Sequence, residues 1–163
     1  MDIKIRLLDT PEDMQELELL HKKVWGSSYL DVIPVHLSLA LIHNGGVVLG
    51  AFDGDRLVGH ILVFLGIDHR SPDKAAAARL KHASHELAVD PEYRSQGIGL
   101  ALKLAQRNIV RQQGVKLITW TYDPLLSLNA HLNIRRLGTV CDTYLENEYG
   151  DMQDELNRGI ASD

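Results

Sequence analysis

Hydrophobic residues recur at two different spacings in the first part of the chain. Residues 3–7 alternate apolar with charged side chains, which predicts a strand with one buried face. Thr10 can cap a helix and Pro11 suits its first position, and the apolar residues that follow at helical spacing predict a helix ending at Gly26. A second, shorter helix is predicted for residues 34–43, because Asn-Gly-Gly follows it.

The middle of the chain is dominated by strand patterns. Residues 47–52 and 57–65 are rich in β-branched and aromatic side chains and flank the sequence Asp-Gly-Asp-Arg, which predicts an antiparallel hairpin. Residues 69–81 are polar with an alanine run, and both an exposed loop and a short helix fit them. Residues 82–89 are a further predicted strand, ended by Asp-Pro because proline cannot continue a strand ladder.

Helical spacing returns in the second half of the chain. An amphipathic helix is predicted from Ile98 to the region of Gly114. Residues 115–122 then predict a strand, residues 125–137 a helix, and residues 139–145 a last strand. The order of strand, two helices, three strands, helix, strand, helix and strand is that of an α/β (α+β) domain.

Composition narrows the class of protein. The chain has 163 residues, of which 45% are hydrophobic, so we expect residues 1–163 to form a single domain. It has no apolar run of about 18 residues or more and no secretion signal at its start, so no membrane partner is expected. Cys141, the single cysteine, cannot form an internal disulfide, which fits a cytoplasmic location.

Charge argues against nucleic acid as a partner. The formal net charge is −5, whereas affinity for a phosphate backbone comes from clustered lysine and arginine. Four basic residues do lie near one another in the sequence, but we expect most of them on the solvated face of one helix. They are Arg94, Lys103, Arg107 and Arg111.

The strongest chemical signal is RSQGIG at residues 94–99, between a predicted strand and a predicted helix. Glycines at a helix start let the backbone approach a ligand, and the free N–H groups there, with the helix dipole, make a pyrophosphate site. A plain connecting turn is the alternative. A dinucleotide-binding loop would need a third glycine and a later acid, but Leu102 and Thr119 stand there, and no Walker loop is present.

The segment LAVDPEYRSQGIGLALKL resembles motif A of the GNAT superfamily of acetyltransferases, whose core is RxxGxG. The predicted element order agrees over nearly the whole chain. The resemblance implies a mixed, mostly antiparallel sheet flanked by helices and splayed between its fourth and fifth strands. It also implies an N-acyltransferase that moves acetyl, or another acyl group, directly from acyl-CoA to a small-molecule or peptide amine. The alternative is a non-catalytic sensor or assembly domain that binds CoA or acyl-CoA.

The resemblance also implies where acetyl-CoA would bind. The pantetheine arm would pair with a strand edge in the splay, and the backbone N–H groups of the glycine loop would hold the pyrophosphate. Two asparagines four residues apart on one helix face are placed to bind the pantetheine amides. The predicted cofactor-binding residues are Leu87, Ala88, Val89, Arg94, Ser95, Gln96, Gly97, Gly99, Leu100, Asn129 and Asn133.

The family often takes its catalytic base from the fourth strand. His85 has the same strand parity as Leu87 and Val89, while Glu86 should face the other side, so only one of the two would face the cleft. Imidazole titrates near neutral pH, so we favour His85 over Glu86, with a histidine bonded to a nearby carbonyl as the alternative. No metal is predicted, because His82 and His85 should point to opposite faces.

One position departs from the family pattern. Many GNAT enzymes carry a tyrosine on the last helix, four residues before its closing glycine, to protonate the leaving thiolate. Here that position is Ile134, so the acid is missing or is replaced by Asn133, Tyr122 or water. Trp25 and Tyr29 fall where the family's first interhelical loop covers the acceptor site.

The later sequence resembles a narrower group. TWTYDPLLSLNAHLN and ENEYGDMQDELNRGIASD are similar to a subgroup of predicted bacterial and archaeal acetyltransferases. Members of that subgroup continue past this point, so we expect the polar residues 146–163 to be a truncated tail. Both a monomer and a homodimer fit the sequence.

Overall fold

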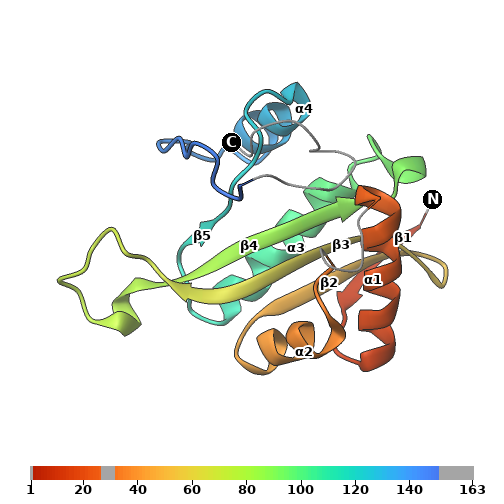
Figure 1. Cartoon of the computed structure of the whole chain (residues 1–163), viewed down its shortest axis with the longest axis horizontal. Coiled ribbons are helices and arrows are strands. Elements are labelled where there is room, and N and C mark those ends of the chain that lie inside the picture. The colour runs from red at the N-terminus through yellow and green to blue at the C-terminus, as the bar shows by residue number, and fades with distance from the viewer. Residues whose placement is uncertain (1, 27–31, 151–163) are drawn as a thin grey trace.

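A five-stranded sheet forms the centre of the protein in the computed structural model, which describes residues 2–26 and 32–150. The strand order is β1-β2-β3-β4-β5; the first three pairings are antiparallel and β4–β5 is parallel. Helices α1 and α2 lie on one face of the sheet and α3 lies on the other (Figure 1). The elements are β1 (Ile3–Leu7), α1 (Pro11–Trp25), α2 (Val35–His43), β2 (Val47–Asp53), β3 (Arg56–Ile67), β4 (Leu80–Val89), α3 (Ile98–Gln112), β5 (Ile118–Thr119) and α4 (Ser127–Ala130).

Each face of the sheet has its own hydrophobic core. On the α1 face, Leu17 packs in a cluster with Leu62 of β3, and on the α3 face Leu102 packs in a cluster with Val63. Neighbouring residues of β3 therefore point to opposite faces, as strand geometry requires. Because both faces are covered, β2 is a continuous apolar run rather than an alternating one.

Helix α1 begins where the sequence predicts. The Thr10 hydroxyl accepts a hydrogen bond from the Asp13 backbone N–H at 3.1 Å, and the Asp13 carboxylate accepts one from the Thr10 N–H at 3.3 Å. This reciprocal pair is a capping box. The Arg6 guanidinium donates to Asp13 at 2.8 Å, and this bond is the main reason that the pKa of Asp13 falls to about 2. Gly26, at φ +60°, closes the helix in the left-handed conformation.

The hairpin and its surroundings are also confirmed. Asp53 pairs with Arg56, so the turn between β2 and β3 contains only Gly54 and Asp55. The polar segment after β3 is a loop with one 3₁₀ turn at Ala76–Arg79, which resolves the open choice between loop and helix. Asp90 and Pro91 end β4, as predicted.

The sheet opens between β4 and β5. These two strands pair only at His82 with Ile118 and at Ala83 with Thr119. From Ser84 to Val89, the edge of β4 has no strand partner within residues 2–26 and 32–150. This opening is the splay expected between the fourth and fifth strands, and the sheet is mixed and mostly antiparallel.

The segment after β5 corrects the sequence predictions. The strand predicted for residues 115–122 is reduced to two residues, and the predicted helix consists of α4 and a π-helical turn at His131–Arg136. The strand predicted for residues 139–145 is wrong, because no strand follows β5 in the described chain. Its apolar residues do not reach the core; Val140 is 86% exposed.

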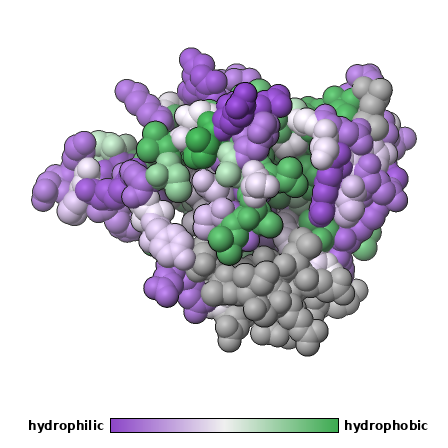
Figure 2. Space-filling model, turned by 90° about the horizontal axis from the view of Figure 1, so that it is seen from above, coloured by the Kyte–Doolittle hydropathy of each residue, from purple (hydrophilic) through white to green (hydrophobic). Residues whose placement is uncertain are grey.

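The same segment leaves apolar side chains at the surface. Figure 2 looks down on the top of the view in Figure 1 and shows hydrophobic residues exposed between hydrophilic ones. Exposed apolar residues of α4 and its neighbours include Leu125, Leu126, Leu128 and Ile134. None of the helices in the described residues is both long enough and apolar enough to cross a lipid bilayer.

Candidate active site

The start of α3 is a bare helix terminus beside the open edge of β4. Gly97 precedes the helix at φ +83°, no side chain caps it, and a Cβ there would meet no atom within 4 Å. Ser95 also adopts a positive φ, +63°. This conformation leaves the backbone N–H groups of the first turn available to an anion, as the sequence predicts for a pyrophosphate site.

Side chains of the same loop hold its shape. Arg94 Nε donates to the Val89 carbonyl at 3.3 Å, and Gln96 Nε2 donates to the Glu92 carbonyl at the same distance. Both side chains are exposed, so Arg94 adds positive charge beside the helix start. A Cβ at Gly99 would lie 3.7 Å from Leu87 of β4, which places the first helical turn against the open strand edge.

A buried carboxylate anchors the loop to the rest of the fold. Asp90 accepts hydrogen bonds from Lys23 of α1 and from Arg56 of β3, both at 2.8 Å, and from the Glu92 backbone N–H at 3.1 Å. Burial raises the pKa of Asp90, but these donors outweigh burial and the net pKa is lowered. The chain is therefore fixed immediately before the residues that lead into the glycine loop.

Strand β4 contains a bulge at His85. Glu86 pairs with Leu62 and Ser84 pairs with Val63, so His85 has no partner on β3. The ring of His85 lies edge-on to that of Phe64, with centroids 6.0 Å apart. Phe64 follows Val63 and therefore lies on the α1 face of the sheet, so His85 and Glu86 are both on that face.

The strand parity predicted from the sequence is therefore wrong. His85 does not share a face with Leu87 and Val89, whose side chains pack with the α3 core. The bulge inserts one residue into β4, and this extra residue reverses the alternation at that point. His85 is exposed and Glu86 is mostly buried, and both reach the same side of the sheet.

Glu86 lies between two histidines that the sequence analysis did not identify. Glu86 Oε1 is 3.2 Å from His21 Nε2, and Glu86 Oε2 is 3.4 Å from His60 Nε2. The Trp25 ring packs at 4.3 Å from the His21 ring, measured between centroids. Burial raises the pKa of Glu86, but the two histidines outweigh it and lower the pKa to about 2. Glu86 is thus a carboxylate at neutral pH.

A different arrangement lies on the α3 face of the same strand. Lys103 Nζ donates to Ser84 Oγ at 2.9 Å and lies 3.8 Å from the centroid of the Trp120 ring. Lys103 is only 6% exposed, so it is the exception to the expectation that most of the four basic residues lie on a solvated face; the other three are exposed. Burial lowers the pKa of Lys103 to about 7. Trp120 Nε1 in turn donates a hydrogen bond to Asn133 Oδ1 at 3.0 Å.

The other candidate residues differ in burial and in hydrogen bonding. Asn133 is buried and its oxygen is engaged by Trp120, whereas Asn129 is half-buried on α4. A hydrogen bond with Cys141, together with burial, raises the pKa of Tyr122. Ile134 is 44% exposed in the π-helical turn. Tyr29, and the tail from residue 151, lie outside the described residues.

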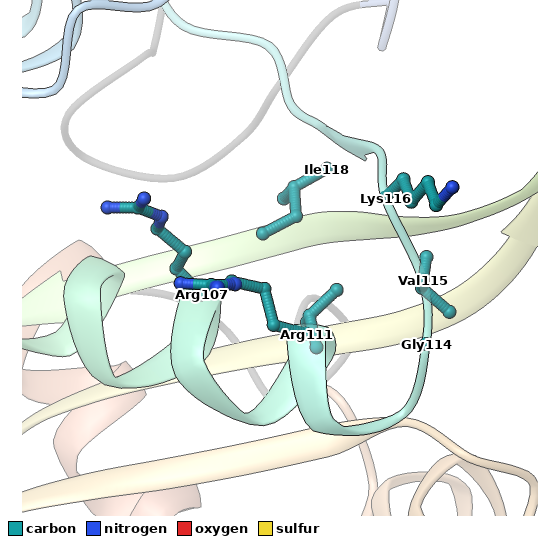
Figure 3. Close-up of a pocket in the computed structure, with 7 residues that line it drawn as sticks. Arg107, Arg111, Gly114, Val115, Lys116 and Ile118 are labelled. Carbon is teal, nitrogen blue, oxygen red and sulfur yellow. The ribbon is translucent and has the colours of Figure 1, made fainter.

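A separate open pocket lies at the other end of α3 and near β5. It is lined by Arg107 and Arg111 of the helix and by Val115 and Ile118 of the segment that follows (Figure 3). None of the predicted cofactor or catalytic residues lines it. In the part of the chain that the structure describes, no group of three or more His, Cys, Asp or Glu side chains could hold a metal ion.

A mixed sheet that opens at its parallel edge, beside an uncapped glycine-rich helix start, is the arrangement that the resemblance to GNAT acetyltransferases predicted. The family model described as the acetyltransferase (GNAT) family matches residues 12–138. The chain therefore belongs to the GNAT family. No curated protein matches it.

Solved structures support the same fold. An aminoglycoside acetyltransferase, meta-AAC0020 from an uncultured soil metagenomic sample, solved with trehalose, is 18% identical, with a TM-score of 0.72 over 93% of this chain and 97% of that one. AAC(6')-Iy, solved with the bisubstrate analogue CoA-S-monomethyl-acetylneamine, is 15% identical, with a TM-score of 0.71 over 89% and 95%. Ribosomal-protein-alanine N-acetyltransferase from Brucella melitensis biovar Abortus 2308 is 17% identical, with a TM-score of 0.62 over 88% and 98%.

Proposed function

We propose that this chain transfers an acetyl group from acetyl-CoA directly to the amine of a small molecule or peptide. The observation that carries the proposal is the uncapped start of α3 at Gly97 beside the unpaired edge of β4. Membership of the GNAT family supports the reaction class. The analogue bound to AAC(6')-Iy joins CoA to an acetylated amine compound in one molecule, which supports a ternary complex as the reacting species.

The cofactor would occupy the splay. The N–H groups around Gln96, Gly97, Gly99 and Leu100 would bind its pyrophosphate, and the charge of Arg94 would assist. The pantetheine arm would pair with the β4 edge at Leu87–Val89 as an added strand does. Because the glycine loop follows the Val89 end of β4, the arm would enter there and extend toward Ser84.

His85 is the proposed acceptor of the amine proton. It is exposed at the bulge, where a substrate can approach it, and it lies on the same face as Glu86. Glu86, with a pKa of about 2 and both oxygens bonded to histidines, is a weak proton acceptor at neutral pH. Its fixed negative charge would instead attract the protonated amine before transfer.

The sulfur would leave without a dedicated tyrosine acid. Ile134 cannot donate a proton, and a thiol with a pKa of about 8.5 already leaves as a tolerable thiolate. Orientation in a near-attack geometry can contribute more than general acid catalysis, so the missing tyrosine need not abolish turnover. Cys141 is an exposed free thiol, which fits the reducing cytoplasm as the proposed location.

The test is thiol release from acetyl-CoA in the presence of separate amines. The panel would contain aminoglycosides, other small amines, amino acids and peptides with a free N-terminus. We expect release to require both acetyl-CoA and at least one of these amines. Saturable binding of acetyl-CoA with no release across the panel would instead favour the non-catalytic sensor or assembly domain, for which Ile134 is the supporting observation.

A further inference from the structure

Lys103 occupies the point at which β4 and β5 separate. The last paired residues of the two strands are Ala83 and Thr119. The residues that follow them are Ser84 of β4 and Trp120, just after the end of β5. Lys103 Nζ contacts both, at 2.9 Å from the Ser84 hydroxyl and 3.8 Å from the Trp120 ring centroid. The amine of α3 therefore closes the narrow end of the splay.

The surroundings of this amine are unusual for a lysine. It is 6% exposed, and no carboxylate lies within ion-pair distance of it in the described chain. Burial without a counter-charge disfavours the ammonium form and lowers the pKa of Lys103 to about 7. The neutral amine is therefore populated near pH 7, whereas a fully solvated lysine, with a pKa of about 10.4, is neutral in fewer than about one molecule in 10³.

The proposed cofactor orientation brings an electrophile to this end of the splay. The helix rises about 1.5 Å per residue, so Lys103 lies about 9 Å along α3 from Gly97, in the direction that the arm takes. An arm that enters at Val89 and follows β4 carries its thioester toward Ser84. This step rests on the proposed function, because it uses the same acetyl-CoA site.

We propose that Lys103 is a self-acetylation site. The neutral Nζ attacks the thioester carbonyl carbon of bound acetyl-CoA, an N–C amide bond forms, and the C–S bond breaks. The sulfur leaves as thiolate and takes up the proton that the nitrogen releases, so the products are free CoA and N-acetyl-Lys103. A desolvated lysine is an activated nucleophile for such a step. The amide carries no charge at any pH, so the product can no longer form the ammonium that would contact the Trp120 ring.

The experiment incubates the full chain with acetyl-CoA alone and locates acetyl groups by intact mass and peptide mapping. Lys116, which is exposed, serves as the comparison within the same molecule. We expect Lys103 to be acetylated at least tenfold faster than Lys116 near pH 7. The ratio should fall as the pH rises toward 10, because solvated amines then become neutral as well. Acetyl phosphate, which lacks the pantetheine arm, should favour Lys103 much less than acetyl-CoA does.

Three variants sharpen the test. Lys103→Arg keeps the charge but should remove the fast modification. Gly97→Asp should slow it, whereas Gly114→Asp, the same change at a positive φ at the other end of α3, should not. A chain that binds acetyl-CoA saturably but acetylates Lys103 no faster than Lys116 would overturn the self-acetylation proposal and leave the proposed function standing. Absence of acetyl-CoA binding would overturn both.

Discussion

Strand β4 presents a buried ionisable group on each face, and the two are stabilised differently. On the α1 face, Glu86 has two histidine partners, and its pKa is lowered to about 2, which favours the charged form. On the α3 face, Lys103 has a hydroxyl and an aromatic ring, and its pKa is lowered to about 7, which favours the neutral form. Both pKa values are lowered. A lower pKa favours the charged form of the carboxylic acid Glu86 but the neutral form of the amine Lys103.

The difference shows that partners, rather than burial, decide whether a buried group keeps its charge. Burial penalises either charge, and only matching hydrogen-bond partners, donors for a carboxylate and acceptors for an ammonium, or a counter-charge offset that penalty. Glu86 is therefore suited to act as a fixed negative charge beside the acceptor site. Lys103 is suited to nucleophilic chemistry, because its neutral form is populated at neutral pH.

The largest expected effect lies on the α1 face. If His85 takes the amine proton, His85→Ala should lower kcat by about 10² to 10⁴, with acetyl-CoA affinity nearly intact. Glu86→Gln should lower kcat much less and act mainly on the KM for the amine. Steady-state thiol release with an accepted amine measures both. The opposite ranking would identify Glu86 as the proton acceptor.

The pH dependence of stability should separate the two faces. Glu86 titrates near 4.5 when unfolded and near 2 when folded, so its contribution is present above pH 4.5 and is lost as the pH falls toward 2. The shift corresponds to about 3 kcal/mol at most. Lys103 titrates near 10.5 unfolded and near 7 folded, so the unfolded chain binds more protons between these values and stability rises with pH there.

Chemical denaturation across the pH range, compared between the parent and each variant, measures these contributions. Glu86→Gln should abolish only the loss of stability between pH 4.5 and 2. Lys103→Met should abolish only the increase in stability between pH 7 and 10.5. A Lys103→Met profile parallel to the parent throughout the alkaline range would show that the lysine is charged in the folded protein.

Replacing Glu86 or Lys103 by an apolar residue should have a smaller effect, on the free energy of unfolding at neutral pH. Glu86→Leu leaves His21 and His60 without their acceptor, which should lower the free energy of unfolding by about 1–3 kcal/mol at neutral pH. Lys103→Met keeps the apolar stem and removes an uncompensated charge, so it should be neutral or stabilising. Urea titrations at pH 7 measure both. Equal losses of unfolding free energy in the two variants would show that the two buried groups are not stabilised differently.

The smallest expected effect concerns the leaving group. The raised pKa of Tyr122 makes it a poorer acid than an ordinary tyrosine, so Tyr122→Phe should leave kcat within a fewfold of the parent. Asn133→Ala should raise the acetyl-CoA KM at least as much as it lowers kcat, because Asn133 holds Trp120 at the splay. A collapse of kcat in a folded Tyr122→Phe variant would identify Tyr122 as a relocated acid.

Local sequence signals predicted the parts of the fold that local interactions determine. The Thr10 cap, the turn at Gly54 and the glycine before α3 each depend on residues a few positions apart, and all three are confirmed. The strand predicted for residues 139–145 failed because alternation alone does not create a pairing partner, and Val140 instead points to solvent.

The chemistry of β4 could not be predicted in the same way. The bulge at His85 depends on how β3 pairs with β4, and strand parity counted along one strand cannot reveal it. His21 lies at helical spacing from Leu17 and Val24 in the buried stripe of α1. This spacing indicates that His21 is buried but not which residue it contacts. Glu86 and Lys103 take their partners from other elements, so only the folded chain shows which charge is compensated.

The proposed function requires that acetyl-CoA bind in the splay with its pyrophosphate at the start of α3. Calorimetric titration of acetyl-CoA tests it most directly, with Gly97→Asp against Gly114→Asp as the matched pair, since both glycines have positive φ and open space at Cβ. We expect saturable binding that Gly97→Asp weakens well over tenfold, above about 1.4 kcal/mol, and that Gly114→Asp leaves nearly unchanged. Unchanged affinity in a folded Gly97→Asp variant would contradict it.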